Sequence, residues 1–118
     1  MSKIISIPTF SDKRGSISII EKFINFKIKR VYYLYNFTNF SRAQHKHKKN
    51  IQFVICIKGD IILKVINKKI SKYRLNNPKK GVLLEPNDWH EIIPKIKKSV
   101  VLVLASEFYN KKDYINEI

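Results

Sequence analysis

The chain has 118 residues, of which 44% are hydrophobic, and it carries a formal net charge of +15. This length suits a single domain over residues 1–118, and the apolar content excludes a disordered chain. No apolar run approaches the roughly 20 residues that cross a membrane, the interrupted N-terminus argues against a signal peptide, and the lone cysteine, Cys56, favours a reduced cytoplasmic setting.

Strand signals recur along the chain. Apolar β-branched and aromatic residues are concentrated in short segments, and glycine, asparagine, proline and aspartate separate these segments. The last ten residues predict one helical turn. The predicted strands are residues 3–7, 16–20, 29–37, 51–58, 61–67, 69–75, 82–84 and 99–105.

The spacing of these strands indicates the fold class. Many short strands about ten residues apart, with turn signals and no alternation with helices, predict an all-β antiparallel sandwich or barrel. Gly59-Asp60 lies between two strong strands and is typical of a tight hairpin. We find no repeat or linker that would indicate a second domain.

The most informative segment contains two of the three histidines. His45 and His47 are two residues apart, and on a strand this spacing puts both rings on the same face. Histidine titrates near pH 6.5 in water, which suits general acid–base chemistry at neutral pH. The alternative is a surface strand beside a run of lysines. We favour catalysis because the surrounding motifs agree with it.

The layout resembles the two signature motifs of the cupin superfamily, and this resemblance implies a jelly-roll barrel. In metal-binding cupins, three histidines and one glutamate hold the ion. Here Gln52, a neutral and weak ligand, replaces the acid. We therefore expect no metal and no cofactor. The matching residues are His45, His47, Gln52 and Gly59 for the first motif, and Gly81, Pro86 and His90 for the second.

Further motifs occur in a characteristic order along almost the whole chain. Together they resemble the small cupins that act on dTDP-4-keto-6-deoxyglucose, the sugar 3,4-ketoisomerases, which are related to the WxcM-like sugar enzymes. Ala43 departs from this family, which usually has glycine there, and so does Lys46, where a small residue is common. The motifs are Asp12-Lys13-Arg14-Gly15, Lys29-Arg30-Val31-Tyr32-Tyr33, Trp89-His90-Glu91 and Asp113-Tyr114-Ile115.

The resemblance implies an isomerase that moves the keto group of a dTDP-4-keto-6-deoxyhexose from C4 to C3. The product would feed the synthesis of a 3-amino-3,6-dideoxysugar for a surface glycan. A base removes the C3 proton, an enediol forms, and a proton returns to C4. The family implies His45 as the main base, His47 as its partner, and a homodimer in which the strand at residues 3–7 pairs across subunits.

Several other residues are candidates for binding the substrate. Arginine suits the diphosphate because it makes bidentate contacts, although Arg14 has the alternative role of fixing its own turn. His90 is equally suited to a structural hydrogen bond. Neighbouring tyrosines at 32 and 33 point to opposite faces, so one of them belongs to the core. The candidates are Arg14, Arg30, Tyr33, Arg42, Lys48, Gln52 and His90.

Two other functions remain open. One is a nucleotide-sugar epimerase on a related barrel, which pairs a histidine with a tyrosine. The other is a non-enzymatic module that binds sugar or nucleic acid, as the net charge suggests. Only four of the 24 basic residues are arginines, and the lysines are scattered. We therefore expect no nucleic-acid partner, and we expect the positive field to attract a nucleotide diphosphate.

Overall fold

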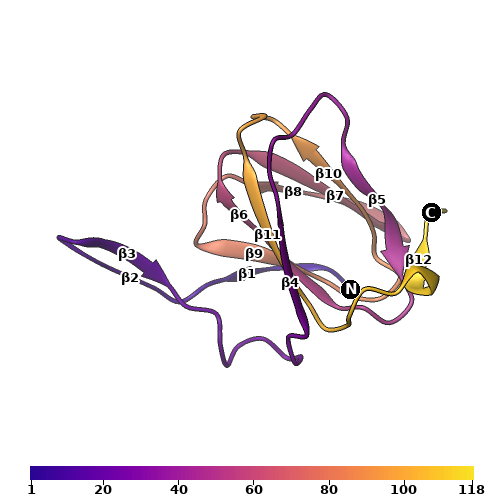
Figure 1. Cartoon of the computed structure of the whole chain (residues 1–118), viewed down its shortest axis with the longest axis horizontal. Helices are drawn as coiled ribbons and strands as arrows, with labels where there is room; N and C mark the ends of the chain where they lie inside the picture. Colours follow the sequence, from indigo (N-terminus) through magenta and orange to yellow (C-terminus); the bar gives the residue numbers. More distant parts are fainter.

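The computed structural model describes residues 1–118, which form two facing antiparallel sheets and a projecting hairpin (Figure 1). The one helical segment, η1 (Lys111–Asp113), is a 3-10 turn, and no helix is long enough to cross a membrane. The first sheet has the order β1 (Lys3–Ser6), β9 (Lys80–Leu84), β6 (Gln52–Lys58), β11 (Val100–Ala105) and β4 (Arg30–Leu34). The second has the order β12 (Tyr114–Ile115), β5 (Arg42–His47), β10 (Trp89–Pro94), β7 (Ile61–Asn67) and β8 (Lys69–Leu75).

The core lies between the sheets, which gives the all-β jelly-roll barrel that the sequence predicts. Strand β6 is buried on both faces because two layers cover it. Val54 points into the barrel, whereas Phe53 packs outward against the loop after β3 (Gly15–Ser18), where Phe23 meets it edge-on with ring centroids 5.8 Å apart. A strand covered on both faces reads as a continuous apolar run, which explains the apolar sequence of residues 53–56.

The eight predicted strands agree with strands of the structure to within a few residues, but β2 (Thr9–Asp12), β5, β10 and β12 are not among them. The predicted hairpin at Gly59-Asp60 is wrong. β6 pairs with β9 and β11, whereas β7 pairs with β8 and β10. Residues 59 and 60 therefore carry the chain from one sheet to the other. Gly59 has a φ of +101°, and Ser99 packs where its side chain would lie. A corner and a hairpin use the same turn residues, so the sequence did not separate them.

The N-terminal strand also pairs within its own subunit. β1 pairs with β9 of the same chain, from Lys3 opposite Leu83 to Ser6 opposite Lys80. β1 is the edge strand of its sheet, so this pairing uses one of its two edges. The segment that projects is the next one, the hairpin of β2 (Thr9–Asp12) and β3 (Figure 1).

A bulge in β5 sets the register of the histidine strand. His45 lies opposite His90 on β10, and Ala43 lies opposite Glu91, so Gln44 is an extra residue. Ala43 and Gln44 have φ values of 71° and 60°, in the left-handed region that favours glycine. Bulges of this kind redirect side chains beside functional sites.

This strain predicts that Ala43→Gly stabilises the protein. A left-handed alanine costs about 1–2 kcal/mol, and the greater chain entropy of unfolded glycine offsets about 0.5–1 kcal/mol of that. We expect the free energy of unfolding in urea to rise by about 0.5–1 kcal/mol. Ala105→Gly, in the regular strand β11, is the matched control and should destabilise. Equal destabilisation by both variants would show that the backbone of Ala43 is not strained.

Candidate active site

A cavity of about 460 Å³ opens inside the barrel, between β4 of the first sheet and β5 and β10 of the second. Apolar side chains form most of its wall, and polar groups from both sheets converge on it. This combination is typical of small-molecule sites. Six of the residues that the sequence singled out border this cavity: Arg30, Tyr33, Arg42, His45, Gln52 and His90.

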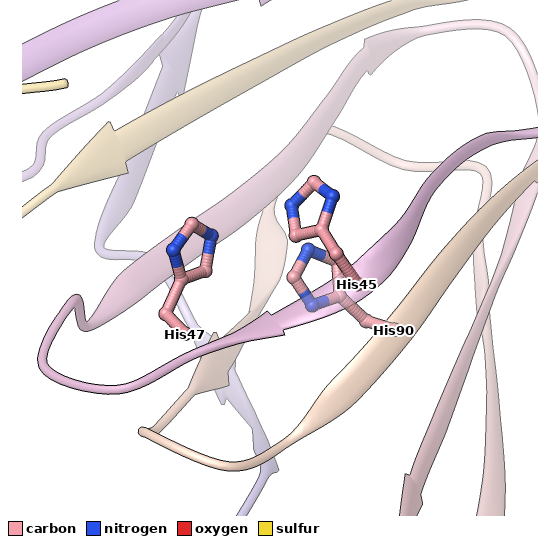
Figure 2. Close-up of side chains that lie close together, drawn as sticks. All are labelled: His45, His47 and His90. Atoms are coloured by element: carbon pink, nitrogen blue, oxygen red, sulfur yellow. The ribbon is translucent and has the colours of Figure 1, made fainter. Parts of the chain in front are cut away.

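The three histidines of the chain form one cluster (Figure 2), and two of them, His45 and His90, border this cavity. The ring centroid of His45 lies 4.9 Å from that of His47 and 4.9 Å from that of His90. The two-residue spacing on β5 therefore puts both rings on one face, as predicted. His45 is half-buried and borders the cavity, whereas His47 is buried beside it.

The hydrogen bonds of the three rings fix their tautomers. Nδ1 of His45 lies 3.1 Å from the carbonyl oxygen of Ala43, and Nδ1 of His90 lies 3.1 Å from that of Asp88. Nδ1 of His47 lies 3.0 Å from a carboxylate oxygen of Asp113. These oxygens only accept, so each Nδ1 donates. A neutral ring then has its lone pair on Nε2.

Burial keeps these rings neutral at physiological pH, because it disfavours the charged form. Burial first, and the nearby His47 second, lower the pKa of His45 to about 4. Burial likewise lowers the pKa of His90 to about 3, with His45 as the next cause. The pKa of His47 is also lowered by burial, although the hydrogen bond that His47 donates to Asp113 opposes the shift.

Polar groups on the opposite wall complete the cavity. The side-chain amide of Gln52 donates to the hydroxyl of Tyr32 over 2.8 Å, which leaves the hydroxyl proton free to donate to a ligand. Burial raises the pKa of Tyr32, so this proton is retained. The guanidinium of Arg30 lies 4.3 Å from the centroid of the Tyr32 ring, and Arg42 adds a second positive charge at the cavity.

Sequence reasoning missed three residues here: Tyr32, Asp113 and Tyr114. Asp113 is 66 residues from His47, and Asn110 caps the 3-10 turn that holds it. Tyr114 pairs with His47 across β12 and β5, and its ring lies 4.7 Å from His45. The motif at 113–115 belonged to the family resemblance, but no spacing along the chain links it to a histidine.

Three candidates occupy less central positions. Arg14 lies at the tip of the projecting hairpin, where it pairs with Asp12, and it does not border the cavity of its own chain. Lys48 is exposed outside the cavity, and its backbone N–H donates to the carbonyl of Asp113. Tyr33 lies at the rim of the cavity, where it is 64% exposed and stacks on Tyr35. Side chains alternate along a strand, so its neighbour Tyr32 points inward instead.

Comparison with known proteins finds a family model that matches all of residues 1–118, FdtA, described as WxcM-like, C-terminal. A TDP-4-oxo-6-deoxy-alpha-D-glucose-3,4-oxoisomerase from Aneurinibacillus thermoaerophilus is 37% identical over 121 residues, which cover 98% of this chain and 86% of that protein.

Solved structures agree in fold with the chain over nearly its full length. The WlaRB TDP-quinovose 3,4-ketoisomerase of Campylobacter jejuni is 35% identical with a TM-score of 0.94, covering 98% of this chain and 92% of that one. A mutant of the 3,4-ketoisomerase QdtA from Thermoanaerobacterium thermosaccharolyticum, in complex with TDP-4-keto-6-deoxyglucose, is 34% identical with a TM-score of 0.92, covering 98% and 87%.

The low pKa of His90 predicts that acid destabilises the protein. Below about pH 6.5 the unfolded chain takes up a proton at this residue, but the folded chain does not until its own pKa of about 3. The free energy of unfolding should therefore fall as the pH drops, by on the order of 3 kcal/mol from His90 between about pH 7 and pH 4. Urea unfolding of the wild type and of His90→Gln measures this. If the free energy of unfolding depended on pH in the same way in both proteins, His90 would not be the source of the acid sensitivity.

Proposed function

Because the chain belongs to the FdtA family of WxcM-like, C-terminal proteins, we propose that it is a dTDP-sugar 3,4-ketoisomerase. Its substrate is a dTDP-4-keto-6-deoxyhexose, whose keto group it moves from C4 to C3. Relatives named for this reaction match 98% of the chain at 34–37% identity. The observation that carries the proposal is the row of neutral imidazoles, with free lone pairs, in the wall of a cavity of sugar-nucleotide size.

The reaction is a balanced exchange within the substrate. A base takes the proton from C3, which the C4 ketone acidifies, and the electron pair forms an enediolate. A proton then arrives at C4, and the C3 hydroxyl loses its own proton to become the ketone, while the C4 oxygen becomes a hydroxyl. No electron leaves the sugar, so no redox cofactor is required.

His45 is the proposed base because it borders the cavity and presents a free Nε2 lone pair. With a pKa lowered to about 4, it is unprotonated at neutral pH. The imidazolium formed after proton removal is correspondingly acidic, so it exchanges its proton with solvent and delivers a proton readily to C4. His47 is its partner: the ring is held by Asp113 and lies against His45, which fixes the orientation of both.

Donors around the cavity can stabilise the negative charge on the enediolate oxygens. The free hydroxyl proton of Tyr32 and the charges of Arg30 and Arg42 meet in this space. Preorganised donors of this kind often make the largest contribution to such a reaction. The ketone that results at C3 is the group on which an amine donor would build a 3-amino-3,6-dideoxysugar, for a surface glycan assembled from cytoplasmic nucleotide sugars.

We further propose a homodimer in which the β2–β3 hairpin brings Arg14 to the partner's cavity. Phe10 and Ile17 are cross-strand neighbours on this hairpin and are 63% and 59% exposed, which is costly for a pair of apolar side chains in a monomer. Arg14 is also too far along the projecting hairpin to serve its own cavity. A partner subunit would cover the apolar pair and receive the guanidinium near the diphosphate.

The first test is incubation with dTDP-4-keto-6-deoxyglucose, followed by NMR of the product. The wild type should yield the 3-keto sugar and incorporate solvent deuterium at C4. His45→Asn keeps the packing but loses the base, so kcat should fall by about 10²–10⁴-fold and deuterium should no longer enter. His47→Asn should impair turnover with nucleotide binding retained.

Near wild-type rates for both histidine variants would refute the assignment of the site. Deuterium at C3 and C5 without migration of the keto group would instead identify an epimerase.

The second test concerns Arg14 and the dimer. Arg14→Ala should raise KM, at a cost of about 1–3 kcal/mol for a lost charge-assisted contact, while Lys13→Ala in the same turn should not. A heterodimer of Arg14→Ala and His45→Asn subunits, purified with two tags, contains one intact site if Arg14 acts in the partner. Its kcat/KM should then be about half that of the wild type. If the kcat/KM of the heterodimer were no higher than that of the Arg14→Ala or His45→Asn homodimer, Arg14 would not act across subunits.

A further inference from the structure

The bulge in β5 is tied to the neighbouring strand by side chains as well as by the backbone ladder. The hydroxyl of Ser41 donates to Oε2 of Glu91 over 2.5 Å, and the side-chain amide of Gln44 donates to the same oxygen over 3.2 Å. Ser41 directly precedes β5, whereas Gln44 is the extra residue within it. One carboxylate therefore spans the bulge, and hydrogen bonds to a charged acceptor are the stronger kind.

Glu91 is a firm anchor for these bonds because β10 has a neighbouring strand on each side. Glu91 lies opposite Lys64 of β7 on one side and opposite Ala43 of β5 on the other. Its side chain is half-buried and points to the outer face of the sheet, since its neighbour His90 points into the barrel. Glu91 does not border the cavity, so it can act on a bound sugar only through other residues.

The bulge decides which side chains of β5 reach the cavity. Arg42 lies opposite Ile92 of the core, and both Arg42 and His45 border the cavity. Residues three apart on a regular strand point to opposite faces. Without the extra residue, Gln44 would lie opposite His90, and His45 would turn outward. The bulge therefore brings a positive charge and an imidazole into the same space.

The bulge also fixes the tautomer of His45. Nδ1 of this ring donates to the carbonyl oxygen of Ala43, which is one of the two left-handed residues. Left-handed residues other than glycine persist only where their surroundings hold them. If residues 43 and 44 relaxed, this carbonyl would turn away and the ring would lose its acceptor. The orientation and the tautomer of His45 thus both depend on what holds the bulge.

We propose that Glu91 is a positioning residue for His45 and Arg42. Its carboxylate locks the bulge, and the locked bulge presents the imidazole to the cavity with Nε2 free. Glu91 touches no substrate, so it acts on turnover rather than on nucleotide binding. The effect on turnover rests on the proposed isomerase function, whereas the effect on the His45 ring does not.

The first measurement compares the kinetics of Glu91→Ala and Glu91→Gln in the full chain. Alanine removes both hydrogen bonds, so kcat should fall by about 10–100-fold while KM changes little, because a misplacement of about 1 Å can cost that much. Glutamine keeps an acceptor oxygen in the same place and should restore most of kcat. Ser41→Ala removes one of the two bonds and should give an intermediate kcat, which tests the proposal even if Glu91→Ala does not fold.

Glu85→Ala is the matched control. Glu85 is also half-buried and also accepts a hydrogen bond, from the N-terminal amino group, but it lies outside the bulge. This variant removes the same charge and should keep the wild-type kcat. Circular dichroism confirms that each variant folds.

NMR of the ring nitrogens tests the positioning without any substrate. In the wild type, the neutral ring of His45 should carry its proton on Nδ1. In Glu91→Ala, a ring protonated on Nε2 should appear, because the carbonyl of Ala43 is no longer held. In Glu91→Gln and Glu85→Ala the ring should match that of the wild type.

Each measurement has a result that contradicts the proposal. An unchanged His45 ring in Glu91→Ala would overturn the positioning, whatever the rate. A wild-type kcat in Glu91→Ala, or an equal fall in Glu85→Ala, would overturn the role in turnover. If the protein isomerises no sugar but Glu91→Ala still changes the His45 ring, the proposed function fails and the positioning stands.

Discussion

The pairing of β5 with β10 is the constraint on which the site depends. It places His45 directly opposite His90, and the two-residue period of β5 then brings His47 beside them. The bulge at Gln44 sets this register at the expense of two left-handed residues. A slip of one residue would turn both β5 rings toward solvent, so the strained backbone is part of what assembles the site.

Burial gives this arrangement its chemistry. Three imidazoles packed together cannot all be charged, because each would be desolvated and would repel the others. Burial lowers the pKa of each ring, so all three are neutral, with Nδ1 occupied and Nε2 free, and this supports the proposed base. The charged groups at the same cavity are positive, because Arg30 and Arg42 border it, and they favour an anionic substrate.

Sequence reasoning was most accurate where the signal is local. The alternation of a strand put His45 and His47 on one face, and the apolar β-branched segments located eight of the strands to within a few residues. It was weaker where contacts are distant along the chain. Asp113 reaches His47 only because a capped turn follows the last long strand, and Gly59-Asp60 joins two sheets, which a turn dipeptide alone does not distinguish from a hairpin. Arg14 is remote from the cavity because the hairpin that carries it projects from the barrel, and no local pattern revealed this.

The protonation state of the three rings is the central claim, and NMR of their ring nitrogens tests it most directly. Two-bond proton–nitrogen correlation spectra of the ¹⁵N-labelled protein at about neutral pH distinguish the two neutral tautomers from the charged ring. We predict that His45, His47 and His90 are all neutral, with the proton on Nδ1 and the lone pair on Nε2. A charged ring, or a proton on Nε2 of His45, would contradict the account.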